Sequence, residues 1–153
     1  MKKVTTMYSI NDYVIHQNNH IYQIIAINNQ ITLKSPLNNN SILADSKDII
    51  RKVTTKKELE EIIERIPYIR TLEITSERFR QELYRKTFDS YLEIEWIKLI
   101  KTIYLRHRFH KVQPYELDYL KQTQTLFHEE VAIVLNMPID KVDDYIKNKI
   151  MEF

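Results

Sequence analysis

The chain has 153 residues, with 23 Lys and Arg against 21 Asp and Glu, and it contains neither cysteine nor glycine. Its length and its 43% of hydrophobic residues are enough for one ordinary domain or two small ones. The missing cysteines exclude disulfide frameworks, thiol nucleophiles and cysteine-rich metal sites, and the missing glycines exclude the phosphate-binding loops of nucleotide-binding proteins.

Residues 1–53 are expected to form a small antiparallel β domain. Clusters of asparagine at 18–19, 28–29 and 38–40 separate short runs rich in β-branched and aromatic residues. Because the chain has no glycine, these asparagines are expected to supply the left-handed turn positions. Short strands between such turns predict a meander or barrel of Tudor- or SH3-like size. The expected strands are Asp12–Gln17, His20–Ile27, Gln30–Ser35, Ser41–Asp45 and a short fifth near Ile49–Val53.

Residues 54–153 show helical periodicity and predict a bundle of about five helices, so the fold class is α+β. Thr55 with Glu58, and Ser90 with Glu93, have the spacing of capping boxes at the starts of the first and third helices. The second helix is expected from 75 or 76 to about 87, the fourth from Pro114 to about 135, and the last after Pro138. The expected core residues are Leu59, Ile62, Ile63, Ile66, Phe79, Leu83, Phe88, Trp96, Ile97, Ile100, Ile103, Tyr104, Leu117, Leu120, Phe127, Val131, Val134, Val142, Tyr145, Ile146 and Ile150.

Charge is distributed unevenly along the helical part. Residues 76–112 carry 9 basic and 5 acidic side chains, whereas 113–153 carry 4 and 8. Basic side chains gathered from helix ends could neutralise phosphates of a nucleic acid. The alternative is an ordinary solvated helical surface, and no helix-turn-helix, zinc-finger or RNA-binding motif is present. The basic candidates are Arg78, Arg80, Arg85, Lys86, Arg106, Arg108 and Lys121.

Other chemistry is disfavoured. Two histidine pairs, His16 with His20 and His107 with His110, lack the third ligand that catalytic zinc requires, so neither a metal nor a cofactor is expected. The adjacent carboxylates at 60–61, 129–130 and 143–144 are interpreted as solvated helical faces. No nucleophile with a base and an orienting group can be assembled, and we expect no enzymatic activity.

The N-terminal segment has no apolar region of the kind that signal peptides carry. No apolar stretch reaches the roughly 18 residues needed to span a bilayer. We therefore expect a cytoplasmic protein without membrane contact, and nothing in the sequence demands more than a monomer.

Short fragments of both halves follow one another in the order of a known family. Together they resemble the CarD family of bacterial transcription regulators that bind RNA polymerase, and the resemblance covers nearly the whole chain. The N-terminal fragments are Tyr8-Ser-Ile-Asn-Asp-Tyr-Val-Ile-His16, Ile21-Tyr-Gln-Ile24 and Leu43-Ala-Asp-Ser-Lys47. The C-terminal ones are Ser76-Glu-Arg-Phe79, Glu82-Leu83, Ile103-Tyr-Leu-Arg106, Val112-Gln-Pro-Tyr-Glu116 and Glu130-Val-Ala132.

The resemblance implies a transcription regulator with two contacts. The β domain, residues 1–53, would bind the polymerase β subunit partly by laying strand against strand, near Lys34, Ser41, Ile42 and Leu43. The helical domain, residues 54–153, would contact promoter DNA and modulate open-complex stability. The alternative is an adaptor on RNA polymerase whose helical part has little or no DNA binding.

This chain departs from the family pattern at several positions. The family's glycines are absent, so Asn18 and Asn19 are expected to remake its tight turn. The family's minor-groove Trp aligns with Thr75, which is therefore included among the DNA candidates. The chain's one tryptophan, Trp96, lies on the predicted buried side of the third helix and is interpreted as core. Ile42 aligns with a residue that the family often uses at the polymerase contact.

Overall fold

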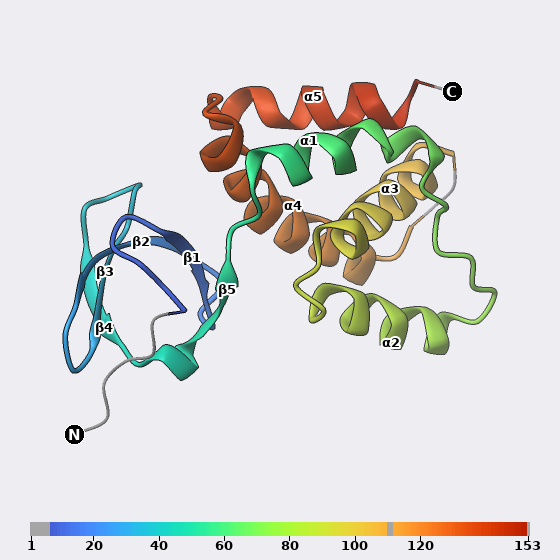
Figure 1. Ribbon diagram of the computed structural model, residues 1–153. Coiled ribbons are helices and arrows are strands. Elements are labelled where there is room, and N and C mark those ends of the chain that lie inside the picture. The colour runs from blue at the N-terminus through green and yellow to red at the C-terminus, as the bar shows by residue number, and fades with distance from the viewer. Residues whose placement is uncertain (1–6, 110–111, 153) are drawn as a thin grey trace. The chain divides into compact units, whose positions relative to one another are not determined.

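The computed structural model describes residues 7–109 and 112–152 (Figure 1). The fold class is α+β, as predicted: a five-stranded antiparallel sheet precedes five α-helices. The chain divides into two compact units, residues 1–54, the β unit, and residues 55–153, the helical unit. Within the described ranges, no helix combines the length and hydropathy that crossing a bilayer would need.

The β unit is a meander whose last strand returns to the first. The strand order in the sheet is β4-β3-β2-β1-β5, and all pairs are antiparallel. A short 3₁₀ helix, Ser46–Asp48, leads from β4 into β5. This layout is consistent with the small barrel that the sequence predicts. The strands are β1 (Tyr13–His16), β2 (Ile21–Ile27), β3 (Ile31–Lys34), β4 (Ser41–Ala44) and β5 (Ile49–Lys52).

Alternating residues of these strands form the core of the β unit. Side chains point to opposite faces at successive strand positions, and the inward series includes Ile24 of β2 and both Ile31 and Leu33 of β3, all fully buried. On β4 the inward positions are Ala44, which is buried, and Ile42, which packs against the same cluster. The regular alternation on β3 and β4 fixes which of their side chains remain outside.

Asparagine replaces glycine at the left-handed turn positions. Asn19 and Asn39 have φ of 66° and 61°, which confirms the prediction for two of the three asparagine clusters. Asn11 and Asn136 also have positive φ, whereas the cluster at 28–29 turns without it. The short polar side chain of asparagine tolerates this region at lower cost than other residues with a Cβ.

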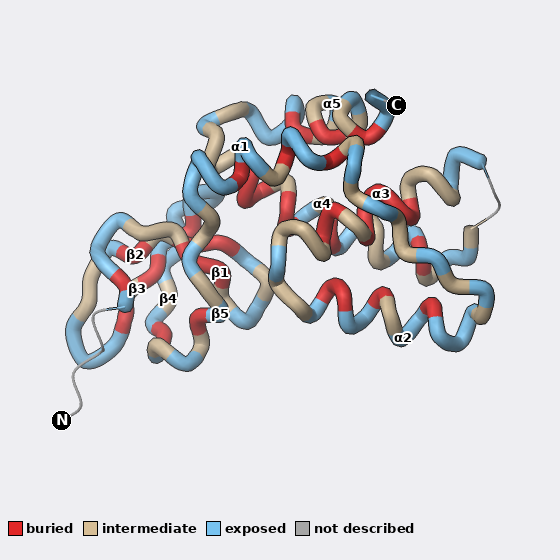
Figure 2. Tube along the Cα trace, turned by 45° about the vertical axis from the view of Figure 1, so that its right-hand side comes forward, coloured by how far each residue is buried: buried red, intermediate tan, exposed pale blue. Residues whose placement is uncertain are grey.

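The helical unit is built around its longest helix, α4, which packs against each of the other four helices. Buried positions recur along α3, along α4 and on one side of α2 (Figure 2). Trp96 is fully buried against Phe127, and its indole N–H donates to the Phe88 carbonyl at 2.9 Å, which confirms its predicted core position. The helices are α1 (Lys56–Glu64), α2 (Glu77–Phe88), α3 (Glu93–Phe109), α4 (Pro114–Leu135) and α5 (Ile139–Ile150), and a 3₁₀ turn, Ile66–Tyr68, follows α1.

The two predicted capping signals have different outcomes. Thr55 is the N-cap of α1, and its side-chain oxygen accepts from the Glu58 N–H at 3.2 Å. Ser90 does not cap α3, because it lies in the turn after α2, where its hydroxyl donates to the Thr87 carbonyl at 2.7 Å. The left-handed Tyr91, with φ of 52°, then separates Ser90 from the start of α3. A capping box does form before α4, between Gln113 and Glu116.

Several residues predicted to lie in the core are exposed, because a neighbouring polar or charged residue occupies the inward position of the helix. Phe79 is 62% exposed, because the inward positions of α2 belong to Arg80, Tyr84, Thr87 and Phe88. Leu117 is 39% exposed, because its neighbour Glu116 takes the inward position at the start of α4. Six further core candidates are only half-buried: Ile62, Leu83, Tyr104, Leu120, Val134 and Tyr145.

The carboxylates Glu129 and Glu130, expected in solvent, are both buried. No residue of α4 from Leu126 to Leu135 is exposed, so this half of the helix has no solvated face. Burial raises the pKa of Glu129 to about 7, and its Oε1 has no hydrogen-bond partner among the described residues. The prediction for this pair is therefore wrong, whereas Glu60 and Glu61 on α1 are exposed as expected.

A buried lysine closes the turn after α1. The Lys101 side chain of α3 donates from Nζ to the carbonyls of Ile66 and Ile69, both at 2.8 Å, and of Pro67 at 3.2 Å. The residue is 7% exposed, and burial lowers the pKa of its ammonium group. One ammonium group thus satisfies three main-chain acceptors that follow a helix, where carbonyls otherwise lack partners.

The change Lys101→Met is therefore expected to lower the free energy of unfolding by about 2–3 kcal/mol, because it leaves carbonyl groups unsatisfied in a buried turn. Chemical denaturation of the purified protein measures this loss. The matched change Lys98→Met removes a surface pair with Glu95 from the same helix and should cost less than about 1 kcal/mol. Equal losses for the two variants would show that the carbonyl contacts contribute little.

Candidate functional site

Strand β4 lies at one edge of the sheet, and half of its main-chain groups have no strand partner among the described residues. The Ser35 N–H donates to the Asn40 carbonyl at 2.8 Å, and this bond fixes the alternation of the β3–β4 ladder. Antiparallel pairs exchange hydrogen bonds at every second position. Ile42 and Ala44 therefore face β3, whereas the N–H and C=O groups of Ser41 and Leu43 project from the sheet edge.

Some side chains at this edge are exposed to solvent, and one points into the core of the β unit. Leu43 is 65% exposed, and Ser41 and Lys34, which lie opposite each other in the β3–β4 pair, are also exposed. Ile42 points inward and packs against the core, so of the four predicted polymerase-contact residues it is the one whose side chain is turned away. We call Lys34, Ser41 and Leu43 the β4 edge.

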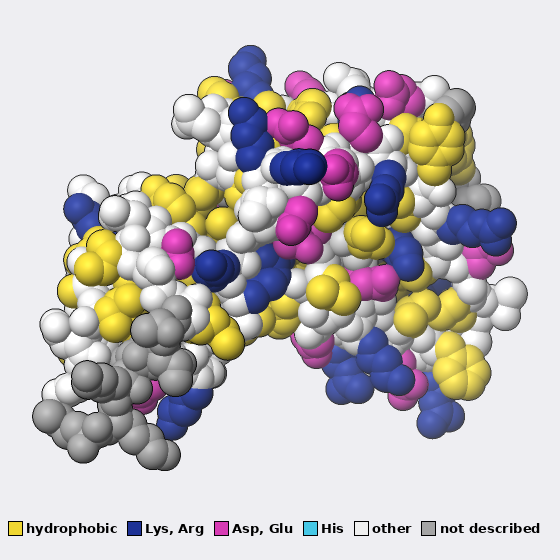
Figure 3. Space-filling model, viewed as in Figure 1, with side chains coloured by type: hydrophobic (Ala, Val, Ile, Leu, Met, Phe, Trp, Pro, Cys, Tyr) yellow, Lys and Arg dark blue, Asp and Glu magenta, His cyan; other side chains and the backbone are white. Residues whose placement is uncertain are grey.

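Three predicted cations lie together on the outer side of α2. Arg78, Arg85 and Lys86 are all exposed, and Arg85 and Lys86 lie two helical turns after Arg78, so the three share one side of the helix. Figure 3 shows Lys and Arg side chains gathered over this helix, with acidic side chains among them. Glu82 and Asp89 are exposed on the same helix and its C-cap. We call Arg78, Arg85 and Lys86 the α2 cationic face.

Arg80, also predicted to bind DNA, lies inside the helical unit. It is 7% exposed, its Nη1 donates to Glu77, and its Nη2 donates to the Ile74 carbonyl at 2.6 Å. The Tyr115 hydroxyl donates to the second oxygen of Glu77 at 2.5 Å. Burial and this hydrogen bond raise the pKa of Tyr115 to about 12. Arg80 therefore joins the start of α2 to α4, and its charge is paired with Glu77 within the helical unit.

Arg106, another predicted DNA residue, belongs to a buried network around Glu116. Glu116 is fully buried; its Oε1 accepts from Arg106 Nε at 2.7 Å and from the Tyr84 hydroxyl at 3.0 Å. Its Oε2 accepts from Arg106 Nη2 at 3.3 Å and from the Gln113 N–H at 2.8 Å. Burial alone would raise the pKa of Glu116, but these hydrogen bonds outweigh it and lower the pKa. The network ties α2, α3 and α4 together.

The remaining predicted cations lie away from the α2 cationic face. Tyr119 of α4 contacts Tyr84 of α2. Lys121 lies two positions further along α4, a rotation of roughly 200°, and so points away from α2. Ile103 of α3 packs in the same cluster as Tyr84 of α2. Arg108 lies five positions further along α3, a net rotation of roughly 140°, and so lies on another side of this helix. Its guanidinium lies 5.5 Å from the centroid of the Phe109 ring. The predicted DNA-binding cations thus divide into one cluster of three, two that are paired with carboxylates of the helical unit, and two separate cations.

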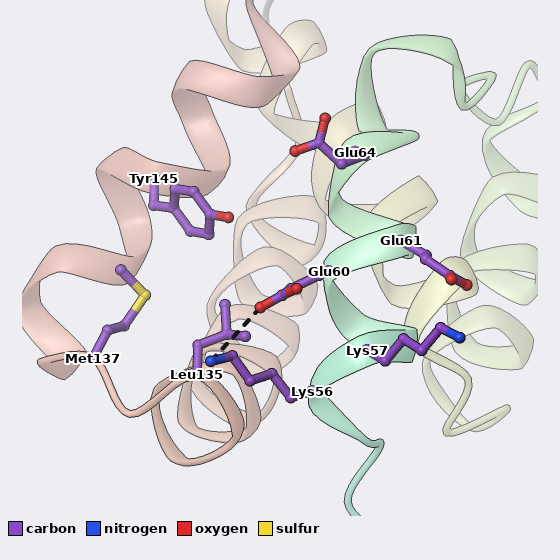
Figure 4. Close-up of a pocket in the computed structure, with 8 residues that line it drawn as sticks. All are labelled: Lys56, Lys57, Glu60, Glu61, Glu64, Leu135, Met137 and Tyr145. Atoms are coloured by element: carbon purple, nitrogen blue, oxygen red, sulfur yellow. Dashed lines mark ion pairs between the residues drawn. The ribbon is translucent and has the colours of Figure 1, made fainter.

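Two cavities open on the helical unit. The first, about 650 Å³, lies between α1 and α5 (Figure 4). Glu60 and Glu64 of α1 point toward Tyr145 of α5, whereas Lys57 and Glu61 turn the other way. Lys56 lies 3.9 Å from Glu60, and Lys149 lies 3.3 Å from Glu64, so the carboxylates that face this groove are balanced by lysines.

The second cavity, about 550 Å³, lies beside the 71–75 segment, α2 and the C-terminal half of α3. Thr75, the exposed residue predicted to take the place of the family's minor-groove tryptophan, lines it. Arg80 and Arg106 reach its wall. Cavities of this size are typical of small-molecule sites.

Titratable clusters suited to a metal are not found within 7–109 and 112–152, where no three His, Asp or Glu side chains come together. His16 Nδ1 accepts from the Asn18 N–H at 3.0 Å and so has a role in the β1–β2 turn. His107 is exposed near the end of α3, and His110 lies outside the described residues.

Comparison of the chain with protein-family models found no match, and comparison with curated proteins found none either. The resemblance to the CarD family therefore rests on the order and spacing of the sequence fragments given above. What it implies about partners stays a prediction.

Proposed function

We propose that this protein is a transcription regulator that binds the β subunit of RNA polymerase by strand addition at the β4 edge. The observation that carries the proposal is the unpaired edge of β4, where Ser41 and Leu43 present main-chain donors and acceptors. A partner strand that pairs there gains main-chain hydrogen bonds, which give affinity with little dependence on side-chain identity. The exposed Leu43 side chain adds apolar contact area to the same site.

The α2 cationic face provides the second contact in this proposal, with the phosphates of promoter DNA. Exposed Arg and Lys side chains that neutralise phosphates position a protein on DNA without reading its sequence, and the affinity falls as salt rises. With Arg80 and Arg106 in internal ion pairs, three cations remain on this face. We therefore expect few phosphate contacts and a modest, salt-sensitive affinity. A preference for DNA of the melted promoter would shift the open-complex equilibrium by the difference in affinity.

An adaptor that binds polymerase but not DNA is the second candidate. The observation that favours it is the separation of Arg108 and Lys121 from the α2 cationic face, which limits that face to three of the predicted cations. In the adaptor, the helical unit would hold another protein of the transcription machinery or serve as scaffold.

The double change Arg78→Glu and Arg85→Glu distinguishes these candidates. It reverses two exposed charges without touching the buried pairs, and we expect at least a tenfold loss of duplex affinity at low salt, with polymerase binding retained. Fluorescence anisotropy with a labelled promoter fragment measures the affinity. The matched control Lys57→Glu with Arg65→Glu changes two exposed cations of the α1 region and should leave it unaltered. Unaltered affinity in the α2 variant would remove the DNA role, and a wild-type protein that binds no duplex would select the adaptor.

A further inference from the structure

The cavity beside α2 combines an apolar wall with two fixed cations. Leu72, Leu105 and Phe109 line it, and Phe109 is 64% exposed although it is a large aromatic residue. The cavity volume of about 550 Å³ falls within the range of small-molecule sites. A ring-sized apolar group would be sheltered from water by these side chains.

The two arginines on its wall keep unused donors. Arg80 donates from Nη1 and Nη2, and Arg106 donates from Nε and Nη2. A guanidinium carries five N–H groups, so each arginine has N–H groups that these hydrogen bonds do not use. Glu77 and Glu116 hold the two guanidinium planes in place, which reduces the entropy lost when a ligand binds.

The charged side chains that line the cavity are Arg80, Arg106 and Glu73, so their net charge of one positive suits a ligand with a single anionic group. Glu77 and Glu116, which do not line the cavity, each accept hydrogen bonds from a tyrosine hydroxyl and an arginine and so hold the guanidinium groups in place. Glu73, exposed, also lines the cavity and would repel a polyanion such as a triphosphate. Guanidinium groups recognise carboxylate, sulfonate and phosphate oxygens through directed N–H donors.

We propose that this cavity binds a small amphiphilic anion, in which one carboxylate, sulfonate or phosphate group is joined to an apolar ring. The anionic group lies against the guanidinium groups of Arg80 and Arg106, and the ring lies against Leu105 and Phe109. A ligand there touches the 71–75 segment, α2 and α3 together, and so stabilises the attachment of α2. The inference is independent of the proposed function, because it uses neither the β4 edge nor the α2 cationic face.

The test uses two dyes that share one aromatic body. The probe 8-anilinonaphthalene-1-sulfonate carries the anionic group, and N-phenyl-1-naphthylamine lacks it. Fluorescence titration of the full chain should show one site, with the sulfonate bound at least tenfold more tightly than the neutral dye. The sulfonate should also raise the thermal midpoint of unfolding, since it binds the folded chain. Equal affinity for the two dyes would overturn the proposal.

Two variants locate the site. Thr71→Glu adds a negative charge to the cavity wall and should weaken sulfonate binding at least tenfold, whereas Thr125→Glu adds the same charge to an exposed position of α4 and should not. Leu105→Trp fills the cavity and should abolish binding of both dyes. Circular dichroism confirms that each variant is folded. Wild-type sulfonate affinity in either folded cavity variant would contradict the assignment, as would a loss of affinity in Thr125→Glu equal to that in Thr71→Glu.

Discussion

Replacing Glu116 with leucine is expected to lower the free energy of unfolding by about 3 kcal/mol, the lower end of the range for breaking one side of a buried ion pair. The change leaves Arg106 without its counter-charge and the Tyr84 hydroxyl and Gln113 N–H without their acceptor. The lower end applies because Arg106 keeps 26% of its side chain exposed and can be partly hydrated. Urea denaturation followed by circular dichroism measures the change.

The same network predicts a pH dependence with a definite sign. The folded-state pKa of Glu116 lies below its ordinary value of 4.5, so the folded chain binds this proton less readily than the unfolded chain. The stabilisation is therefore complete above about pH 4.5 and is lost as the pH falls through the lowered folded pKa. The difference between wild type and Glu116→Leu should be constant near neutral pH and should shrink in acid.

The control is the neighbouring carboxylate of the same helix. Asp118 is exposed, and Asp118→Leu should alter the free energy of unfolding by less than about 1 kcal/mol. If Glu116→Leu costs no more than Asp118→Leu, the network does not hold the three helices together. A double change of Arg106→Met with Glu116→Leu should cost less than the sum of the two single changes, because it leaves no unpaired charge.

Replacing Leu43 with proline is expected to weaken binding to the polymerase β subunit at least tenfold while the β unit stays folded. The Leu43 N–H projects away from β3, so its loss removes no bond of the sheet but denies one to an added strand. Proline is tolerated on an edge strand when the missing N–H faces outward. Biolayer interferometry with immobilised polymerase measures the affinity, and circular dichroism confirms the fold.

Leu43→Ala separates the main-chain contribution from the side-chain contribution. It keeps the N–H and removes most of the exposed side chain, so the loss of affinity should be clearly smaller than for Leu43→Pro. If proline binds as wild type does, strand addition at β4 is refuted. If alanine is as damaging as proline, the contact depends on the leucine side chain rather than on the strand edge.

The sequence predicted the elements well because local signals and packing agree in most of them. Thr55 marks the start of α1, Pro114 starts α4, and asparagines 19 and 39 provide the left-handed turns in a chain without glycine. The runs on either side of those turns became β1 to β4, and they are rich in the β-branched and aromatic residues that favour strands. The capping prediction for Ser90 was wrong because its hydroxyl bonds to the Thr87 carbonyl in the turn that ends α2.

The candidate site was less predictable, because the sequence alone does not show whether a basic side chain is buried or exposed. Arg80 and Arg106 look the same as Arg78 in the sequence, yet two are in internal ion pairs and one is exposed. Glu77 lies three residues before Arg80 on α2, a spacing at which helical side chains pair locally. Glu116 of α4, in contrast, reaches Arg106 of α3 only because these two helices pack together. The spacing of Gln113 and Glu116 after the α3 segment was the one local signal of that network.

In the proposed complex, a strand of RNA polymerase pairs with β4. Amide hydrogen exchange of this protein, with and without the polymerase β subunit, measures that pairing at single residues. We expect the amides of Ser41 and Leu43, which face outward in the free protein, to become strongly protected in the complex. A complex that forms while these two amides exchange as fast as in the free protein would contradict the proposed pairing.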